Sequence, residues 1–298
     1  MSTLEATKQT GPVVPVGLTQ SSQPRGVFGG RWWLYVLLIV GLLFVIGPFL
    51  WMVLGSLKAQ SELLRQPPTW LPASPTFGNY TRLWERLNFP RFFWNSTLIA
   101  VGITVSNLVF CSMVGYALAK LRFFGRDLVL MLVLATLLIP GAVLLVPTFV
   151  LMSKLSLIDT LWAVILPAAA APVGVFLMRQ FMLGIPDELL EAGRVDGASE
   201  FYLFWRVVIP LSTPALAALG ILTFLPAWNA LLWPLVVLTS QENFTLPVAL
   251  AIFARGQFQA DYGLLMAGSV VLVLPVIVIF VALQRHFTES ISMTGLKG

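Results

Sequence analysis

The sequence predicts an all-α, polytopic membrane protein. Its 298 residues are 58% hydrophobic and only 10% charged, and the mean hydropathy is +0.88. Soluble domains carry about 25% charged residues. Six stretches without charge are each long enough to cross about 30 Å of hydrocarbon as a helix. The six segments are Trp32–Leu57, Trp94–Ala119, Leu128–Ser153, Thr160–Met178, Val207–Gln241 and Tyr262–Gln284.

The chain before the first segment is polar. Residues 1–30 are rich in Gly, Pro, Ser, Thr and Gln, which predicts a disordered tail. The apolar run from Trp32 to Leu54 is too long for the core of a signal peptide and lacks a small-residue cleavage site, so it is expected to remain as a span. Residues 31–93 then form the first span and a proline-rich loop.

Prolines predict bends in two of the later segments. Pro140-Gly141 and Pro147 should kink the third segment and expose carbonyl groups toward a cavity. The fifth segment is too long for one straight span, so its start is expected along the membrane interface and its end bent or re-entrant. This fifth segment contains Pro210, Pro214, Pro226 and Pro234.

Basic residues favour an orientation with both termini in the cytoplasm. With the N-terminus inside, 11 of the 18 Lys and Arg residues fall on the inner side and 7 on the outer side. Positive charge accumulates in cytoplasmic loops. The short loops agree, since Lys120–Asp127 has three basic residues and Leu155–Asp159 has none.

A run of charge separates the fourth and fifth segments. A charge at the bilayer centre costs roughly 2.5–3.5 kcal/mol, so this polar loop, residues 182–206, must lie in water or against another protein. Pro186-Asp-Glu188 is a good helix start, and the helix is expected to run to about Asp196. Gly197 can adopt positive φ and end it, and Ser199 can cap a second short helix, Glu200 to Arg206.

Small residues lie in the middle of the first helix of the polar loop. Ala192 and Gly193 would let a partner surface approach closely, and Glu191, Arg194 and Asp196 would then pair with that partner. The alternative is a solvated loop with an ordinary Glu191–Arg194 pair, which stabilises a helix by only about 0.2–0.5 kcal/mol.

The order of motifs resembles the permease subunits of carbohydrate importers of the ATP-binding-cassette (ABC) class, in particular the maltose-type second permease subunit. The resemblance covers nearly everything after residue 30. The motifs after the second segment are Ile139-Pro-Gly141, Phe176-Leu-Met-Arg-Gln-Phe181, Ile185-Pro-Asp-Glu-Leu189, Glu191-Ala-Gly193, Asp196-Gly-Ala-Ser199, Ile209-Pro-Leu-Ser212, Trp228-Asn229, Leu232-Trp-Pro-Leu235 and Met266-Ala-Gly-Ser269, and upstream stands Tyr116-Ala-Leu-Ala-Lys-Leu-Arg-Phe123.

The resemblance implies a six-helix type I importer fold with a cytoplasmic coupling helix. It implies a bacterial cytoplasmic (inner) membrane location, a homologous permease partner, two ABC ATPase subunits, an external solute-binding protein and surrounding lipid. The coupling residues would be Glu191, Ala192, Gly193, Arg194, Asp196, Gly197 and Ala198. The core would be residues 94–287, followed by a cytoplasmic tail, 288–298. The chain departs from the family pattern at Gly193, where alanine is usual, and in the tail after Ser290.

Nothing in the sequence indicates an enzyme. The chain lacks the G-x-x-x-x-G-K-[ST] motif, so ATP and Mg²⁺ are expected in the partner ATPase subunits rather than here. No catalytic residue, metal ligand or cofactor is predicted; His286 stands alone near a span end, and Cys111 is interpreted as a small apolar residue. Scattered Lys and Arg at segment ends indicate lipid contact, not nucleic acid.

Candidate solute contacts lie at polar or kinked positions within the segments. Asn229 stands between Trp228 and Trp233, and an amide beside aromatic rings suits a sugar, while Pro140 and Gly141 mark the kink. The alternative for Asn229 is a hydrogen bond between helices. Polar residues of the second segment are expected to serve packing, and small residues of the sixth to allow close helix approach. They are Thr104, Asn107 and Ser112, and Gly263, Gly268 and Ser269.

Two other functions compete with a carbohydrate importer permease. An ion-coupled secondary transporter usually has charged residues at membrane depth and inverted repeats, and neither is evident here. A purely structural membrane protein would not need Asn229 beside kinked segments or an ordered polar loop.

Overall fold

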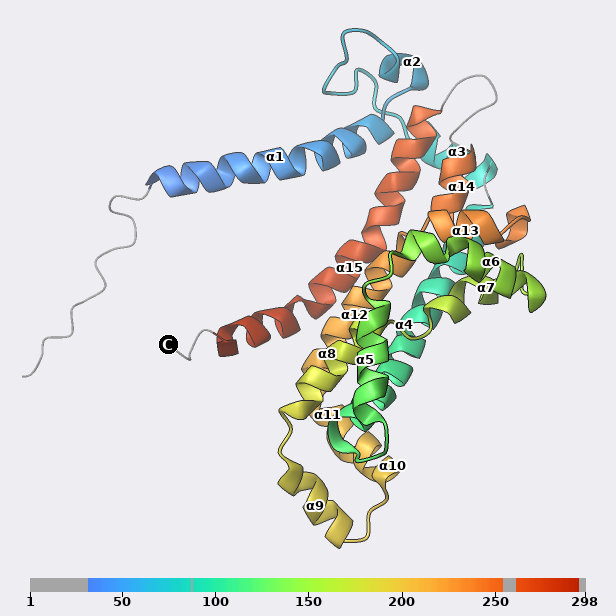
Figure 1. Cartoon of the computed structure of the whole chain (residues 1–298). Coiled ribbons are helices and arrows are strands. Elements are labelled where there is room, and N and C mark those ends of the chain that lie inside the picture. The colour runs from blue at the N-terminus through green and yellow to red at the C-terminus, as the bar shows by residue number, and fades with distance from the viewer. Residues whose placement is uncertain (1–31, 87, 254–260, 295–298) are drawn as a thin grey trace, which may run out of the picture. The chain divides into compact units, whose positions relative to one another are not determined.

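Within the part of the chain that the structure describes, three helices are long and apolar enough to cross a membrane unaided. The computed structural model describes residues 32–86, 88–253 and 261–294, so the predicted tail at 1–30 lies outside the described residues. The three spans are α1 (Trp32–Ser56), α4 (Phe89–Lys120) and the part of α15 (Tyr262–Thr294) up to Ile279 (Figure 1). The helix α15 continues through residues 288–294, which were expected to be tail, and residues 295–298 lie outside the described part.

In the described residues, three further pairs of helices are long and apolar enough to span a membrane together, and each pair is bent at a break. The first joins α5 (Arg126–Thr136) to η1 (Gly141–Leu144) and α6 (Leu145–Lys154) at 96°. The second joins α7 (Trp162–Ile165) and η2 (Leu166–Ala168) to α8 (Pro172–Leu183) at 43°. The third joins residues 200–211 to α12 (Thr213–Trp228) at 80°. With each pair taken as one span, six spans result, as the sequence predicted.

Prolines stand at most of these breaks. Pro140 immediately precedes η1, and Pro172 begins α8. Proline has no backbone N–H and disfavours helical geometry in the residue before it, so each helix ends upstream and a new one starts. The expected kink at Pro140-Gly141 is therefore confirmed, whereas Pro147 lies in the first turn of α6, where proline is tolerated.

The end of the fifth segment is interrupted, as expected. The helix α12 ends at Trp228, and a short helix, α13 (Leu232–Val237), follows after a break. The loop beyond contains η4 (Gln241–Asn243) and α14 (Leu246–Phe253), a helix that the sequence did not predict. The loop after α1 contains α2 (Gln60–Leu63) and α3 (Gly78–Arg86).

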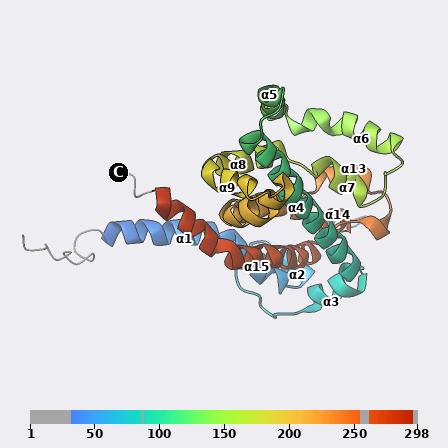
Figure 2. The same cartoon turned by 90° about the horizontal axis from the view of Figure 1, so that it is seen from below.

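The helix α4 is the central element of the unit Leu50–Gly298. It packs along α8 and α12, and α12 in turn packs on α15 (Figures 1 and 2). Glycine permits the close α4–α8 contact, because a Cβ on Gly115 would lie 2.8 Å from Met178 Cβ and 3.0 Å from the Arg179 backbone nitrogen. The expected close approach of α15 is confirmed at Gly268, where a Cβ would overlap the Leu250 side chain of α14.

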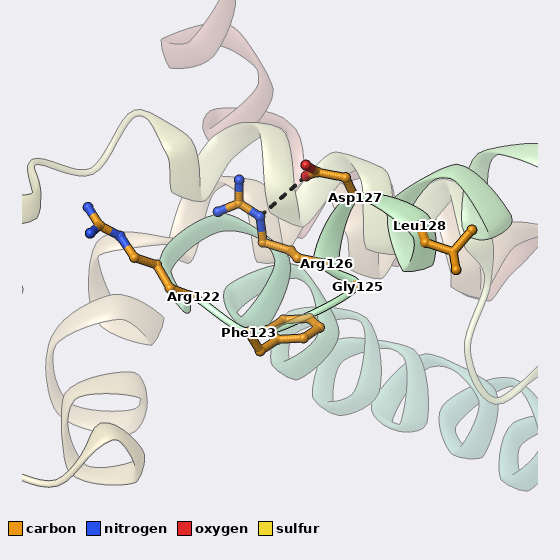
Figure 3. A pocket seen from close by; sticks show the side chains of 6 residues that line it. All are labelled: Arg122, Phe123, Gly125, Arg126, Asp127 and Leu128. Atoms are coloured by element: carbon orange, nitrogen blue, oxygen red, sulfur yellow. Dashed lines mark ion pairs between the residues drawn. The ribbon is translucent and has the colours of Figure 1, made fainter.

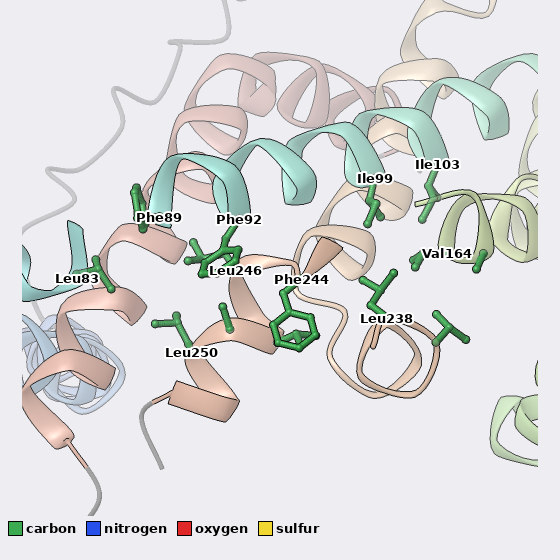
Figure 4. Close-up of a cluster of buried hydrophobic side chains, with 14 of the residues drawn as sticks. Leu83, Phe89, Phe92, Ile99, Ile103, Val164, Leu238, Phe244, Leu246 and Leu250 are labelled. Carbon is green, nitrogen blue, oxygen red and sulfur yellow. The ribbon is translucent and has the colours of Figure 1, made fainter. Parts of the chain in front are cut away.

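Buried side chains of α4 and α14 form an apolar cluster that extends to α7 and the residue after α13. Figure 4 shows Phe92, Ile99 and Ile103 of α4 on one side of this cluster and Leu246 of α14 on the other. Leu246 and Phe92 are fully buried. Ala227, before the break after Trp228, and Val237, after it, both pack in this cluster.

Asp159 joins two loops at the edge of this cluster. It has φ of 62°, and its carboxylate accepts hydrogen bonds from the Thr239 and Ser240 N–H groups, both at 2.9 Å, and from the Ser240 hydroxyl. Desolvation raises the pKa of this carboxyl, but the hydrogen bonds from Ser240 and Thr239 outweigh it and lower the pKa to about 2. Asp159 is therefore ionised throughout the physiological range, and it holds the loop after α6 against the loop after α13.

Candidate functional site

The polar loop folds as two short helices separated by a glycine turn. The first, α9 (Asp187–Val195), ends before Gly197, whose φ is 81°. The second, α10 (Glu200–Leu203), is capped by the Ser199 hydroxyl, which accepts the Tyr202 N–H at 3.2 Å. The helix start, the glycine turn and the serine cap are confirmed. The chain continues through a π-helix, η3 (Phe204–Val208), and α11 (Ile209–Leu211) into α12.

The turn at Gly197 has the hydrogen bonds of a Schellman motif. The Gly197 N–H donates to Arg194 O at 3.0 Å, and the Ala198 N–H donates to Gly193 O at 2.9 Å. A Cβ on Gly197 would meet nothing within 4 Å. Glycine is therefore required here by the backbone conformation and not by crowding.

One face of α9 packs on the rest of the chain. Leu190 is 1% exposed and belongs to a buried cluster that includes residues of α4, α8 and α12. A Cβ on Gly193 would lie 2.5 Å from Leu203 Cδ2. Gly193 therefore makes room for Leu203 of its own chain, a reason for its small size that the sequence did not indicate, and the expected partner contact at Gly193 stays a prediction.

Arg194 also has an internal role that differs from the expected one. Its Nε donates to Glu200 Oε1 at 2.6 Å, and its second terminal nitrogen lies 3.3 Å from Glu200 Oε2. Arg194 therefore neither pairs with Glu191 nor remains unpaired for a partner protein. Within the described residues Glu191 has no ion pair and remains exposed. The sequence missed this pair because residues six apart are not neighbours on a continuous helix.

The end of α4 contacts both ends of the segment from α9 to α10. Lys120 Nζ lies 2.6 Å from Asp187 Oδ1, and Tyr116 Oη lies 2.6 Å from Glu200 Oε2. The hydrogen bond and positive charge of Lys120 hold the pKa of Asp187 below its usual value. The sequence indicated neither contact, because more than 60 residues separate the partners along the chain.

The other face of α9 is open and carries three apolar residues, with the exposed Glu188 among them. Leu189 is 48% exposed and Val195 is 87% exposed, and Ala192 lies between them at helical spacing. A hollow of about 600 Å³ adjoins this face and runs between α9 and α10. Its lining includes Leu189, Asp196, Ala198 and Tyr202. The sequence missed Leu189 and Val195, although apolar residues at positions three apart in a charged helix are a usable signal.

A second hollow, of about 370 Å³, lies beside the turn between α4 and α5. Figure 3 shows Arg122 and Arg126 on its rim, with Arg126 Nε 3.5 Å from Asp127 Oδ1. Phe124 in the same turn is fully exposed. The turn thus combines two guanidinium groups with an exposed aromatic ring.

The aromatic residues expected along a solute path are engaged within the chain. Trp228 is 2% exposed, stacks on Phe224 and donates its indole N–H to Leu272 O at 2.9 Å. Trp233 is half-buried and donates its N–H to Ala163 O at 3.0 Å. The expectation that Trp228 faces the solute is therefore wrong in this conformation, because its ring lies inside the helix packing.

Asn229 is exposed at the break between α12 and α13. Its side-chain amide donates to Leu225 O at 2.9 Å, four residues earlier in its own helix, so the alternative of a bond between helices is not realised. Its side-chain carbonyl accepts no hydrogen bond from the described residues. Pro140 and Gly141 are also exposed at their break.

The polar residues of α4 serve packing, as expected. Thr104 and Ser112 bond to carbonyl groups of their own helix, and the fully buried Asn107 bonds across to residues 168 and 171. No group of three or more His, Cys, Asp and Glu residues in the described part of the chain is arranged to hold a metal ion.

The sequence is similar to a known protein family and to several transport permeases. A family model described as "binding-protein-dependent transport system inner membrane component" matches residues 111–293. The arabinooligosaccharides transport system permease protein AraQ of Halalkalibacterium halodurans is 41% identical over 88% of this chain and 96% of its own length. The lactose transport system permease protein LacG of Rhizobium radiobacter is 32% identical over 86% of this chain and 93% of its own.

A solved structure shares the fold. One chain of the crystal structure of a bacterial ABC transporter involved in the import of the acidic polysaccharide alginate superimposes with a TM-score of 0.79 at 25% identity. The match covers 89% of this chain and all of that chain.

Proposed function

This chain belongs to the family of binding-protein-dependent transport system inner membrane components, and we propose that it forms half of the translocation path of an ATP-driven carbohydrate importer. It is a multi-pass permease subunit of an ABC importer. The carbohydrate substrate is supported by the named substrates of its relatives, arabinooligosaccharides and lactose among them. Family membership sets aside the ion-coupled secondary transporter.

The exposed apolar face of α9 is the observation that supports coupling to ATP hydrolysis. Leu189, Ala192 and Val195 lie on a helix whose opposite face is fixed to its own chain through Leu190. In this proposal α9 inserts into a groove of an ABC ATPase, Glu191 and Asp196 lie at the rim of the contact, and the hollow beside Gly197 and Ala198 receives part of the partner. ATP and Mg²⁺ bind in that partner.

The remaining parts of the assembly follow from the same family. A homologous permease completes the path, two ATPases bind at the α9 side, and a solute-binding protein docks on the opposite side of the membrane. The protein then lies in the inner membrane of a bacterium, with both termini and α9 on the cytoplasmic side. The basic turn with Arg122 and Arg126 would lie at the cytoplasmic interface, where anionic lipid headgroups attract guanidinium groups.

A charge on the exposed face of α9 tests this function. Val195→Asp is expected to reduce ATPase co-purification and uptake by at least about tenfold, because a carboxylate would be buried unpaired in an apolar contact. Val195→Thr keeps the shape of the side chain and should remain near wild type. Co-purification and uptake of Val195→Asp at wild-type levels would show that α9 docks nothing.

Asn229 provides a separate test of the solute path. Its exposed carboxamide at the break after α12 is free to accept a hydrogen bond from a sugar hydroxyl. Asn229→Leu is expected to lower uptake by about tenfold, the effect of losing one good hydrogen bond, with assembly unchanged. Trp228 and Trp233 would hold this segment in place through their contacts within the chain. Unchanged uptake kinetics with radiolabelled solute would return Asn229 to a purely local role.

A further inference from the structure

Two polar side chains at the end of α4 hold the α9–α10 segment at two points. Lys120 Nζ donates to Ile185 O at 2.5 Å and to Asp187 Oδ1 at 2.6 Å, where α9 begins. Tyr116 Oη donates to Glu200 Oε2 at 2.6 Å, where α10 begins. Tyr116 and Lys120 are four residues apart and therefore lie on the same face of α4.

Both anchors are buried where they leave α4. The Lys120 side chain is 4% exposed and Tyr116 is 4% exposed. Burying an ammonium group is costly unless the group is paired and hydrogen-bonded. Ion pairs exposed to solvent, by contrast, contribute little to stability. Charge-assisted hydrogen bonds of about 2.6 Å from buried donors are strong and directional. The acceptors are more open, since the Asp187 side chain is 70% exposed and that of Glu200 is 43% exposed. The buried donors therefore set the direction of these contacts, while the carboxylates remain in reach of water.

A third contact, between Arg194 and Glu200, links the end of α9 to the start of α10. The Glu200 carboxylate accepts both Tyr116 and Arg194, so the last turn of α9, the start of α10 and α4 meet at one group. The helix α9 is thus held at its first turn by Lys120 and at its last turn through Glu200. Its backbone connections pass through Gly184 and Gly197, and Gly197 has no side chain to resist a change in the turn.

We propose that Tyr116 and Lys120 are positioning residues that carry the movement of α9 into α4. Two anchors one helical turn apart resist rotation of α9 about either one of them, so a displacement of α9 becomes a displacement of α4. Because α4 packs along α8 and α12, the movement reaches the bent spans that flank the breaks. The inference rests on the proposed docking of α9 to an ATPase.

The test uses the complete importer in proteoliposomes. Tyr116→Phe keeps the ring, whose centroid lies 5.4 Å from that of Phe204, and removes one hydrogen bond. Lys120→Met keeps the aliphatic stem and removes the two contacts of the ammonium group. We expect the ATPases to co-purify at wild-type yield because the open face of α9 is untouched. Solute imported per ATP hydrolysed should fall about threefold in each single variant and about tenfold or more in the double variant.

Matched controls separate positioning from general destabilisation. Lys120→Arg keeps the charge and should restore most of the import per ATP. Tyr262→Phe and Lys154→Met remove the same groups at exposed positions that have no hydrogen-bond or ion-pair partner in the described part of the chain, and should have no effect.

Two results would overturn the inference. The first is wild-type import per ATP in the double variant. The second is a lower yield of assembled complex with unchanged import per complex and per ATP, which would make the contacts purely structural. Failure of the wild-type chain to recruit an ATPase would instead refute the proposed function, and the inference with it.

Discussion

Gly197→Pro is expected to abolish uptake. Gly197 has φ of 81°, and proline is fixed near −65°, so the turn between α9 and α10 cannot form with proline. Proline also lacks the N–H that donates to Arg194 O at 3.0 Å. The combined cost is about 3 kcal/mol or more, and it falls on the segment that holds α9 in position. We expect uptake in cells to drop by more than about tenfold while the spans remain folded.

A graded series at Gly197 isolates the backbone cause. A Cβ here would meet nothing within 4 Å, so other side chains cause no crowding. Asparagine tolerates the left-handed conformation and keeps the N–H, so Gly197→Asn should retain most uptake. Gly197→Ala should lie between, since a Cβ in this region costs about 1–2 kcal/mol. Equal uptake in all three variants would mean that the turn does not position α9.

Local features of the polar loop were predictable from the sequence. The acidic start of α9, the turn at Gly197 and the Ser199 cap each depend on residues within a few positions, and all three are confirmed. The kink at Pro140 was predictable for the same reason, because proline acts on its own helix and the residue before it.

Features set by tertiary packing were not predictable. The sequence does not show that Leu203 folds back onto Gly193, so the internal reason for a glycine at this position was not predictable. Trp228 looked like a solute contact, yet its ring lies between α4 and α15, where it contacts Phe93 and bonds to Leu272 O. Aromatic composition alone does not distinguish a buried ring from an exposed one. The roles of Tyr116 and Lys120 likewise depend on partners about 65–84 residues away.

Asn107→Leu is expected to destabilise the spans themselves. Asn107 is fully buried on α4, where its amide donates to Ala168 O at 2.6 Å and its side-chain carbonyl accepts the Ala171 N–H at 2.7 Å. These two backbone groups flank the 43° break between η2 and α8, so neither has a helical partner to replace Asn107. Leucine fills a similar volume but leaves both groups unsatisfied, at about 1–3 kcal/mol each.

The apparent Tm of Asn107→Leu should therefore fall by roughly 5–10 °C in detergent, measured by intrinsic fluorescence on the purified protein. Ser106→Ala is the matched control, because the Ser106 hydroxyl bonds only to Ile103 O of its own helix and its loss leaves no buried group unpaired. An unchanged Tm in Asn107→Leu would mean that the break satisfies its own backbone groups once the amide is gone. A fall shared by Ser106→Ala would point to a general sensitivity of α4. A fall confined to Asn107→Leu would identify this side chain as the group that allows the fourth span to bend while its backbone remains hydrogen-bonded inside the membrane.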